Sequence, residues 1–360
     1  MRLYVLVSLL SLAAGPALGQ GKVNVYNWSD YIAPKEVERF EKDSGVKVNY
    51  TTYDSNEILD AKLKTGYSGY DVVVPTASPF FVRQLAANLY QPLDKSKLKN
   101  LKNLDPEIMT ALAKYDPGNA HAIPWMWGTT GIGYNVVEIK KRMPDAPVDS
   151  LRMVFDPAVV SKFKDCGVMI LDSPTDVLPA ALKYLGLDPD SKKPEDLAKA
   201  AAVVKAVRPY IRKFHSSEYI NALAGGDICL AFGYSGDIFQ ARDRAAKAKD
   251  KRDIAYAIPK EGSLLWIDVA AIPKDAPDGD EALRFLDFMM DPKVAAASSA
   301  LTGYANANKA ALPLMPKSIT GNPLIYPPTD VRERFYTVTA GTAEQVRDRT
   351  RLWTLIKVGR

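Results

Sequence analysis

Short apolar runs alternate with helix-like stretches along this chain of 360 residues, and this alternation limits its fold more than any other feature. Residues 23–26, 46–50 and 71–74 are apolar or alternate in polarity, as strands do. Between them lie the helix-like stretches 34–42 and 57–63, of which the first begins at a proline. A β-α-β-α-β order predicts a parallel sheet with helices packed on both faces.

The alternation of strand-like and helix-like stretches continues in the second half of the chain. Strand-like runs are expected at residues 168–171, 228–232, 254–258 and 264–272. Helical stretches are expected at residues 180–185, 194–207, 217–223 and 281–290, and the charged segments 330–336 and 344–358 are predicted to be mostly helical. A chain of this length suits two domains. We therefore expect two α/β lobes, with the chain crossing between them more than once.

The N-terminus has the pattern of a secretory signal peptide. Arg2 precedes a twelve-residue apolar stretch, 3–14, and the small residues Ala17 and Gly19 follow. The alternative is a membrane anchor, but twelve residues are too short to span a bilayer. We expect residues 1–19 to be a signal peptide that is cleaved near Gly19 and Gln20, which predicts an exported protein.

Two cysteines in an exported protein are candidates for a disulfide. Cys166 precedes the apolar run 167–171, and Cys229 lies within the apolar run 228–232. Both runs are predicted to be buried strands of one domain. The residues alone leave two interpretations open, a bond between neighbouring strands or two buried free thiols.

Acids, aromatics and hydroxyls gather after the predicted strands, where open α/β sheets bind their ligands. The segments concerned are 27–31, 75–78, 172–176, 233–237, 266–268 and 303–306. None of them contains Lys or Arg, although the chain carries 47 Lys and Arg against 42 Asp and Glu. Aromatic faces attract ammonium groups, and carboxylates bind them through charge-assisted hydrogen bonds. These segments therefore predict a small cationic ligand with amines at its ends and an apolar middle.

Simpler interpretations compete for each residue taken alone. An acid after a strand, Asp30 and Asp172 in particular, can cap the next helix or turn, and a single aromatic can belong to the core. Paired acids can also form a glycosidase site, which the sequence alone leaves open. The two histidines, His121 and His215, do not have metal-ligand spacing. A formal charge of +5 is too small to indicate nucleic-acid binding.

Five segments resemble one family, the polyamine solute-binding proteins of ABC importers. They are residues 27–34, 129–135, 214–217, 226–229 and 304–310, and the resemblance runs in matching order along nearly the whole mature chain. It implies a type II periplasmic solute-binding fold. In that fold each lobe is a mostly parallel sheet flanked by helices, and crossing strands form a hinge beside a central cleft. It also implies that polyamine is captured there and delivered to membrane permease subunits of an ABC importer.

The resemblance assigns ligand roles to individual positions. Trp28, Ser29 and Tyr31 match the first ligand loop of the family, and Asp30 lies in the same motif as a ligand residue acting through water. Asp237 and Asp268 match acids that hold an ammonium group, and Tyr304 matches an aromatic of the wall. The pair Cys166 and Cys229 matches a family disulfide.

Four positions depart from the usual pattern of the family's putrescine binders. Asp176 stands where Glu is usual, Tyr234 replaces Trp, Trp266 stands where Phe is common, and Thr76 replaces Ser. Pro79 adds a residue to the loop after Thr76. We predict a roomier pocket at the Asp176 and Tyr234 end, which would tolerate amines longer than putrescine.

These inferences predict a periplasmic, non-catalytic, monomeric polyamine-binding protein. It would have no catalytic residue, no cofactor, no metal and no nucleic-acid partner. Putrescine is the first candidate ligand, followed by spermidine and cadaverine. The lobes are expected at residues 20–133 plus 255–305 and at 134–254 plus 306–360, with hinge crossings near 133–135, 252–256 and 304–308. The alternatives are a binding protein for another small solute and a secreted hydrolase.

Asp268 is the predicted main anchor for the ligand. It lies within the apolar strand-like run 264–272, so its carboxylate is expected to be buried, and Trp266 should point to the same side by strand alternation. A buried carboxylate is costly unless a cation or donors compensate it. The alternative is a structural aspartate that accepts hydrogen bonds from backbone amides.

Overall fold

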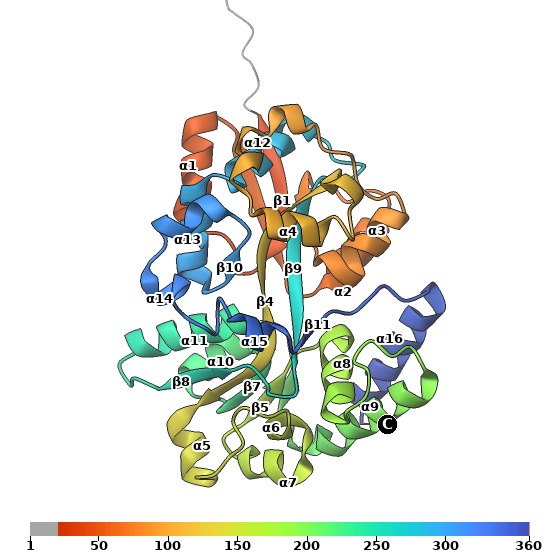
Figure 1. The fold of residues 1–360 in the computed structure, drawn as a ribbon, viewed down its shortest axis with the longest axis vertical. Coiled ribbons are helices and arrows are strands. Elements are labelled where there is room, and N and C mark those ends of the chain that lie inside the picture. Colours follow the sequence, from red (N-terminus) through yellow and green to blue (C-terminus); the bar gives the residue numbers. More distant parts are fainter. Residues whose placement is uncertain (1–20, 360) are drawn as a thin grey trace, which may run out of the picture.

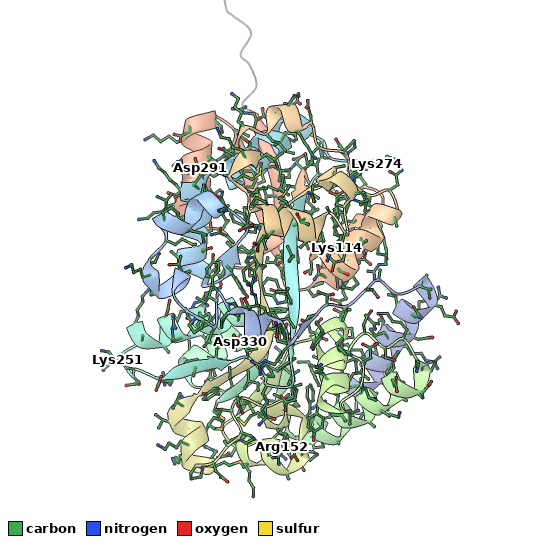
Figure 2. All side chains as sticks on the ribbon, in the orientation of Figure 1. Lys114, Arg152, Lys251, Lys274, Asp291 and Asp330 are labelled. Carbon is green, nitrogen blue, oxygen red and sulfur yellow. A yellow bond between two sulfur atoms is a disulfide. The ribbon has the colours of Figure 1, made fainter. Side chains whose placement is uncertain are left out.

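The structure, a computed structural model, describes residues 21–359 and has two halves stacked along its long axis (Figure 1). The predicted signal peptide and its cleavage position lie outside the described residues. Charged side chains such as Lys274, Arg152 and Lys251 project from the periphery of both halves (Figure 2). The apolar side chains of the strands are buried instead, so each half packs helices against its part of the sheet.

The upper half of Figure 1 begins with the predicted β-α-β-α-β unit. Its elements are β1 (Lys22–Trp28), α1 (Pro34–Ser44), β2 (Lys47–Tyr53), α2 (Asn56–Leu63) and β3 (Val72–Val73). Strand β1 pairs in parallel with both β2 and β3, as the sequence order predicted. All three strands therefore end on the same side, and the loops that follow them carry the first predicted ligand residues.

Two long strands, β4 (Ala122–Asn135) and β9 (Ser263–Ala271), run through the middle of the molecule (Figure 1). They pair antiparallel, and β9 also pairs antiparallel with β3. Strand β4 pairs with β9 up to Thr129 and with β7 (Leu230–Tyr234) from Thr130 onward. One continuous strand thus joins the two halves of the sheet, whose order is β2-β1-β3-β9-β4-β7-β5-β6.

The lower half contains the second set of predicted strands and helices. Strand β5 (Val168–Ile170) pairs in parallel with β7 and with β6 (Lys213–Phe214), and β8 (Ile254–Ala257) pairs antiparallel with β4. The predicted α/β class is present, since strands of one sheet alternate with helices along the chain. The sheet is mixed, because parallel strands form its outer parts and the antiparallel strands β4 and β9 form its centre.

Helices cover both faces of this sheet. The remaining helices of the upper half and of the link to the lower half are α3 (Val82–Ala86), α4 (Pro106–Leu112), α12 (Gly279–Met289), α13 (Pro292–Thr302), α14 (Lys317–Thr320) and α15 (Thr329–Arg332). Those of the lower half are α5 (Val136–Arg142), α6 (Arg152–Phe155), α7 (Pro157–Val160), α8 (Pro174–Tyr184), α9 (Pro194–Val207), α10 (Tyr219–Gly225), α11 (Ser235–Lys247) and α16 (Ala343–Lys357). Short strands β10 (Ala305–Asn306) and β11 (Phe335–Tyr336) pair with β4 and β9.

The C-terminal segment differs in part from its prediction. Residues 330–336 were expected to be helical, but only the short helix α15 forms, and Phe335 and Tyr336 make strand β11. This strand is parallel to β9, whose edge offers backbone partners that a helix there would leave unused. The chain then reaches α16, which forms close to the helix predicted at 344–358 and packs on α8 and α9.

Cys166 and Cys229 form the predicted disulfide, with 5.5 Å between their Cα atoms. The bond links the turn before β5 to the residue before β7, so it joins two neighbouring parallel strands of the lower half. Within residues 21–359, no helix combines the length and the apolar character that crossing a membrane requires.

Candidate functional site

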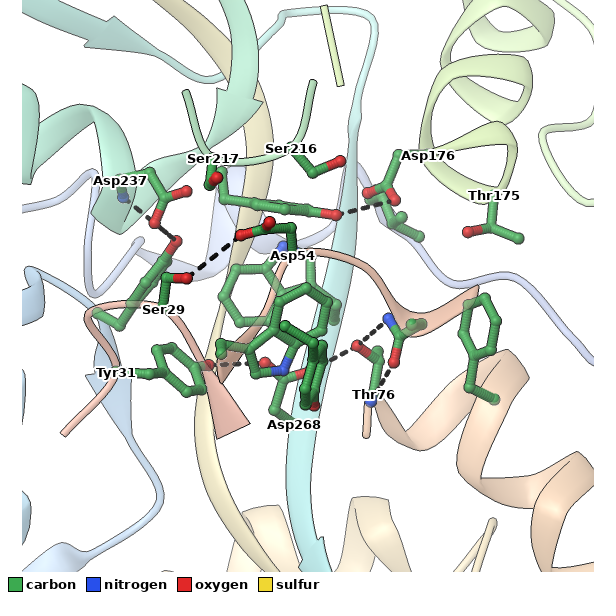
Figure 3. Close-up of a pocket in the computed structure, with 18 of the residues that line it drawn as sticks. Ser29, Tyr31, Asp54, Thr76, Thr175, Asp176, Ser216, Ser217, Asp237 and Asp268 are labelled. Carbon is green, nitrogen blue, oxygen red and sulfur yellow. Dashed lines mark hydrogen bonds between the residues drawn. The ribbon is translucent and has the colours of Figure 1, made fainter. Parts of the chain in front are cut away.

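A cavity with an empty volume of about 680 Å³, its mouth included, lies between the two halves of the molecule. Ten of the eleven predicted ligand residues line it: Trp28, Ser29, Tyr31, Thr76, Asp176, Tyr234, Asp237, Trp266, Asp268 and Tyr304. Figure 3 shows Asp237 and Asp176 on opposite sides, with Asp268 facing them from below. The ends of strands from both halves therefore meet at one cavity, as the strand-end rule predicts.

Asp268 lies on β9 and is only 5% exposed. Its carboxylate accepts hydrogen bonds from the Tyr31 hydroxyl at 2.7 Å and from Thr76 Oγ1 at 2.6 Å. Burial raises the pKa of Asp268 to about 7, although these two hydroxyl groups lower it. Both donors are side-chain hydroxyls. The structure therefore does not contain the alternative arrangement, in which backbone amides donate to this aspartate. Two donors leave acceptor capacity free on a buried carboxylate.

Thr76 is itself fixed by a side chain from the start of α2. Asn56 Nδ2 donates to Thr76 Oγ1 at 2.9 Å, and the Thr76 backbone N–H donates to Asn56 Oδ1 at 3.0 Å. Because Asn56 supplies a donor, the Thr76 hydroxyl hydrogen is directed at Asp268. The orientation of the Asp268 carboxylate thus depends on residues from three separate strand ends.

Asp237 lies in the first turn of α11 and is 9% exposed. The hydroxyl groups of Tyr219 and Tyr304 donate to its two carboxylate oxygens, each at 2.6 Å. Burial raises the pKa of Asp237 to about 6, against the lowering by these two hydroxyls. Tyr219 was not predicted as a site residue, because it lies beneath Asp237 in the core of the lower half and does not line the cavity.

Asp176 stands at the other side of the cavity, in the first turn of α8. Thr130 Oγ1 donates to its Oδ1 at 2.9 Å, and Ser173 Oγ donates to its Oδ2 at 2.6 Å. The Tyr234 hydroxyl lies 3.4 Å from Oδ2. Burial raises the pKa of Asp176 as well. The shorter side chain that replaces the usual Glu is therefore still held in place by neighbouring hydroxyls.

Aromatic rings form a continuous wall between these carboxylates. Ring centroids are 4.8 Å apart for Tyr53 and Trp28, 6.4 Å for Trp28 and Tyr234, and 5.7 Å for Tyr234 and Trp266. The wall continues at 5.1 Å from Trp266 to Tyr304 and at 5.5 Å from Tyr304 to Tyr31. Such a wall covers a methylene chain and presents ring faces to ammonium groups.

The sequence interpretation missed several lining residues. Tyr53 and Asp54 follow β2, and Asp54 accepts a hydrogen bond from Ser29 Oγ at 3.2 Å. The strand-end rule could have found both residues, because they lie at the end of β2, directly before Ser55, the residue that caps α2. Ser216 and Ser217 also line the cavity from the loop before α10, where no strand pattern pointed to them.

Two aspartates near strand ends, Asp30 and Asp172, do not line the cavity. Asp30 does not line the cavity, and its carboxylate pairs with Arg244 of α11 at 2.8 Å on the surface. Asp172 accepts hydrogen bonds from Trp353 Nε1 at 2.6 Å and Lys357 Nζ at 2.8 Å, which anchors α16. Neither acid is a helix cap, and a ligand role for Asp30 stays a prediction.

The cavity is acidic. Asp54, Asp176, Asp237 and Asp268 line it, and no Lys or Arg of residues 21–359 does. Ammonium groups would therefore meet carboxylates at both sides with no competing cation in the wall. In the same part of the chain no group of His, Cys, Asp and Glu is arranged to hold a metal ion.

Comparison with known proteins agrees with this geometry. The family of bacterial extracellular solute-binding proteins matches residues 35–327. The putrescine-binding periplasmic protein SpuD of Pseudomonas aeruginosa is 51% identical over 94% of this chain and 92% of its own length. The putrescine-binding periplasmic protein PotF of Escherichia coli is 48% identical over 98% of this chain and 96% of its own length.

Comparison with solved structures confirms the predicted type II periplasmic fold class. A putative spermidine/putrescine ABC transporter protein from Listeria monocytogenes superposes with a TM-score of 0.84 at 31% identity. That superposition covers 94% of this chain and all of the other.

Proposed function

The chain belongs to the bacterial extracellular solute-binding proteins, and from this premise we propose that it captures a polyamine in the periplasm and delivers it to an ABC importer. It is a solute-binding protein and not an enzyme. The two relatives named above carry putrescine binding in their names, and they match nearly the full length of the chain. Putrescine is the first candidate ligand.

One observation carries the proposal for the ligand class. The buried Asp268 carboxylate sits in an aromatic cavity without a cationic partner among the described residues. Hydroxyl donors alone do not neutralise its charge, so an ammonium group of the ligand is the natural counter-charge. A neutral solute would leave this charge uncompensated, and an anionic solute would be repelled by it.

In the proposed complex, the diamine lies along the aromatic wall. One ammonium group binds Asp268 and Asp237, and the other binds at the Asp176 side. Trp28, Tyr234, Trp266 and Tyr304 cover the methylene groups between them. Ser29, Tyr31 and Thr76 hold the loop and the carboxylates in place.

Closure of two lobes around the ligand accompanies binding in this proposal. The lobes would be residues 20–133 plus 255–305 and residues 134–254 plus 306–360. A hinge would then lie where β4 changes its pairing partner from β9 to β7. Asp30 and Arg244 come from opposite lobes, so their ion pair would form only in the closed state. A ligand favours closure only by the difference in its affinity for the closed and the open state.

The remaining parts of the proposal concern the setting of the protein. The periplasm follows from the relatives, which are named periplasmic proteins. We further propose that a signal peptide is cleaved near Gly19 and Gln20, that the mature protein acts as a monomer, and that its macromolecular partners are permease subunits and not nucleic acid.

Calorimetric titration of the mature protein tests the ligand. The panel is putrescine, cadaverine, spermidine, spermine and agmatine, with 1,4-butanediol as the uncharged match for putrescine. We expect putrescine to bind with a stoichiometry of one and the diol not to bind. Binding of sugars or amino acids in place of amines would overturn the proposal. Turnover of an amine or a glycoside would support the hydrolase alternative.

A further inference from the structure

A second cavity adjoins the Asp176 side of the ligand cavity. Its empty volume is about 800 Å³, including open solvent, and Pro79, Phe80 and Thr175 line both cavities. Thr175 precedes Asp176 in α8, and it lies beside Asp176 in Figure 3. A ligand longer than a diamine that is anchored at Asp268 would therefore extend past Asp176 toward this second cavity.

Glu57 of α2 lines the second cavity and has no assigned role. Its carboxylate oxygen Oε1 is buried and has no hydrogen-bond partner within the part of the chain that the structure describes. A buried carboxylate oxygen without a donor costs free energy, so it is poised to accept a hydrogen bond from a bound group. Glu57 thus continues the series of carboxylates that begins at Asp268 and passes through Asp176.

The charges around Glu57 favour a cation there. Burial raises the pKa of Glu57 to about 7, and the carboxylates of Asp176 and Asp172 add to this rise by more than Arg83 opposes it. Asp176 and Asp172 thus each act on the Glu57 carboxylate more strongly than Arg83 does, although Lys64, Arg83 and Arg349 also line this cavity. An ammonium group placed between Glu57 and Asp176 would relieve their mutual repulsion.

Three cationic side chains line the second cavity: Lys64, Arg83 and Arg349. Arg83 pairs with Asp60 at 3.0 Å and lies over the Phe80 ring, with its guanidinium carbon 5.0 Å from the ring centroid. Burial lowers the pKa of Arg349, and Asp190 opposes that lowering by more than Glu57 does. Lys64 also pairs with Asp60, at 2.6 Å. Arg349, whose buried Nε has no hydrogen-bond partner within the described residues, is therefore the cation left to oppose a ligand ammonium group in this cavity.

We propose that Glu57 is a specificity-determining residue that binds the third ammonium group of a linear triamine of the spermidine type, whose chain passes between Phe80 and Thr175 into the second cavity. This inference rests on the proposed polyamine binding and adds a subsite to it. A diamine such as putrescine ends at Asp176 and does not reach Glu57.

The Glu57→Gln variant tests the subsite. Glutamine keeps the shape of the side chain and removes its charge. We expect the variant to bind spermidine at least tenfold more weakly than the wild type, while its putrescine affinity stays within twofold. The matched control is Glu107→Gln, which removes an exposed glutamate from the first turn of α4 in the same half and should leave both affinities unchanged.

A second measurement distinguishes a ligand-binding role of Glu57 from a purely structural one. Titrations at pH 6.5 in buffers of different ionisation enthalpy count the protons released on binding. Spermidine should release more protons than putrescine from the wild type and an equal number from Glu57→Gln. A merely structural role for Glu57 would lower both affinities together and would not change this difference.

Three results would overturn the inference. The first is a wild type that binds putrescine but not spermidine, and the second is a Glu57→Gln variant with unchanged spermidine affinity. The third is a gain in spermidine affinity in Arg349→Gln with no loss in Glu57→Gln, which would make the second cavity a cationic barrier. Failure of the proposed function is distinct, because the wild type would then bind neither amine.

Discussion

The Tyr31 hydroxyl donates to Asp268 Oδ2 at 2.7 Å, although the two residues are 237 positions apart in the sequence. Tyr31 follows β1 and Asp268 lies on β9, and β3 is the strand that pairs with both. Tyr31 is 4% exposed, and its backbone carbonyl accepts a hydrogen bond from Trp125 Nε1. The Asp268 carboxylate is therefore positioned by a residue of the loop after β1 that is itself packed in the core of one half.

Replacing Asp268 by Asn should weaken polyamine binding strongly. The variant keeps the shape of the side chain but removes the charge that faces the ammonium group. Loss of one partner of a buried charge pair costs about 2–5 kcal/mol, which is roughly thirtyfold or more in affinity. Calorimetric titration with putrescine measures this loss.

Asp280→Asn is the matched control for Asp268→Asn, because Asp280 lies on the surface of the same half and pairs only with Lys97. It should bind putrescine as the wild type does. An Asp268→Asn protein with wild-type affinity would exclude Asp268 as the anchor. Thermal unfolding without ligand verifies that the variant is folded, and its stability should equal or exceed that of the wild type.

Replacing Tyr31 by Phe should reduce affinity less than the loss of Asp268. The variant removes one hydrogen bond to a charged acceptor, which is worth about 1.5–3 kcal/mol. The Asp268 pKa should rise further, since the Tyr31 hydroxyl lowers it in the wild type. The loss of affinity should therefore be larger at pH 6 than at pH 8, and titrations at both values test this. A pH-independent loss would contradict the role of Tyr31 in holding the ionised carboxylate.

The Cys166–Cys229 bond should stabilise the lower half. Its removal by a double Cys→Ser substitution is expected to lower the free energy of unfolding by about 2–5 kcal/mol. Denaturant unfolding of oxidised and reduced protein gives the same comparison without mutation. Two thiols that titrate in unfolded, non-reduced protein would contradict the bond.

Local patterns in the sequence predicted the outer parts of the fold well. The unit from β1 to β3 and the helices α1, α2, α9 and α16 lie close to their expected bounds, because their apolar periodicity and caps are local features. Strand β4 was missed. Its glycines and its mixed polarity do not give the alternation expected of a strand. Its packing against both halves depends on tertiary contacts, which the sequence pattern does not show.

The residues of the candidate site that lie at strand ends could be predicted from the sequence. Asp176, Asp237 and Asp268 line the cavity because the strands preceding or containing them end at one edge. Their hydrogen-bond partners could not be predicted, since Tyr219 and Thr130 come from other elements that only the folded chain brings beside these acids. Glu57 was interpreted only as the start of a helix, and its position beside Asp176 depends on how the two halves meet.

Breaking the Asp30–Arg244 ion pair should speed release of the ligand. The two side chains are 51% and 35% exposed, and such surface pairs contribute about 0.2–1 kcal/mol. Asp30→Asn should therefore raise the dissociation rate by less than about tenfold, measured by stopped-flow competition, and added salt should have less effect on the variant. Arg242→Gln is the matched control, because Arg242 interacts with Asp243 and the Phe239 ring, which both belong to its own helix, α11. An equal effect of both variants would contradict a contact that stabilises closure.

Polyamine affinity should fall as the pH is lowered from 8 to 5. Burial raises the pKa of Asp268 to about 7 and that of Asp237 to about 6, so both carboxyl groups become protonated in the unliganded protein across this range. The ammonium group binds the ionised forms, and binding must therefore release protons. Calorimetric titration at each pH should give a steeper loss below pH 6 than above it. The upper part of the curve should be flatter for Asp268→Asn, and a pH-independent affinity in the wild type would contradict the prediction.

Asp268 and Asp237 also make the stability of the unliganded protein depend on pH, in the direction opposite to that of the affinity. Their folded pKa values lie above the ordinary value of an aspartate, so between about pH 4 and pH 7 the folded state binds more protons than the unfolded state. Their contribution to the free energy of unfolding therefore decreases as the pH rises through this window. Saturating putrescine should remove the effect, because the ammonium group stabilises the ionised carboxylates. Thermal unfolding of the wild type and of Asp268→Asn at pH 5, 6, 7 and 8 isolates the contribution of Asp268, and a wild-type advantage that grows with pH in the absence of ligand would contradict it.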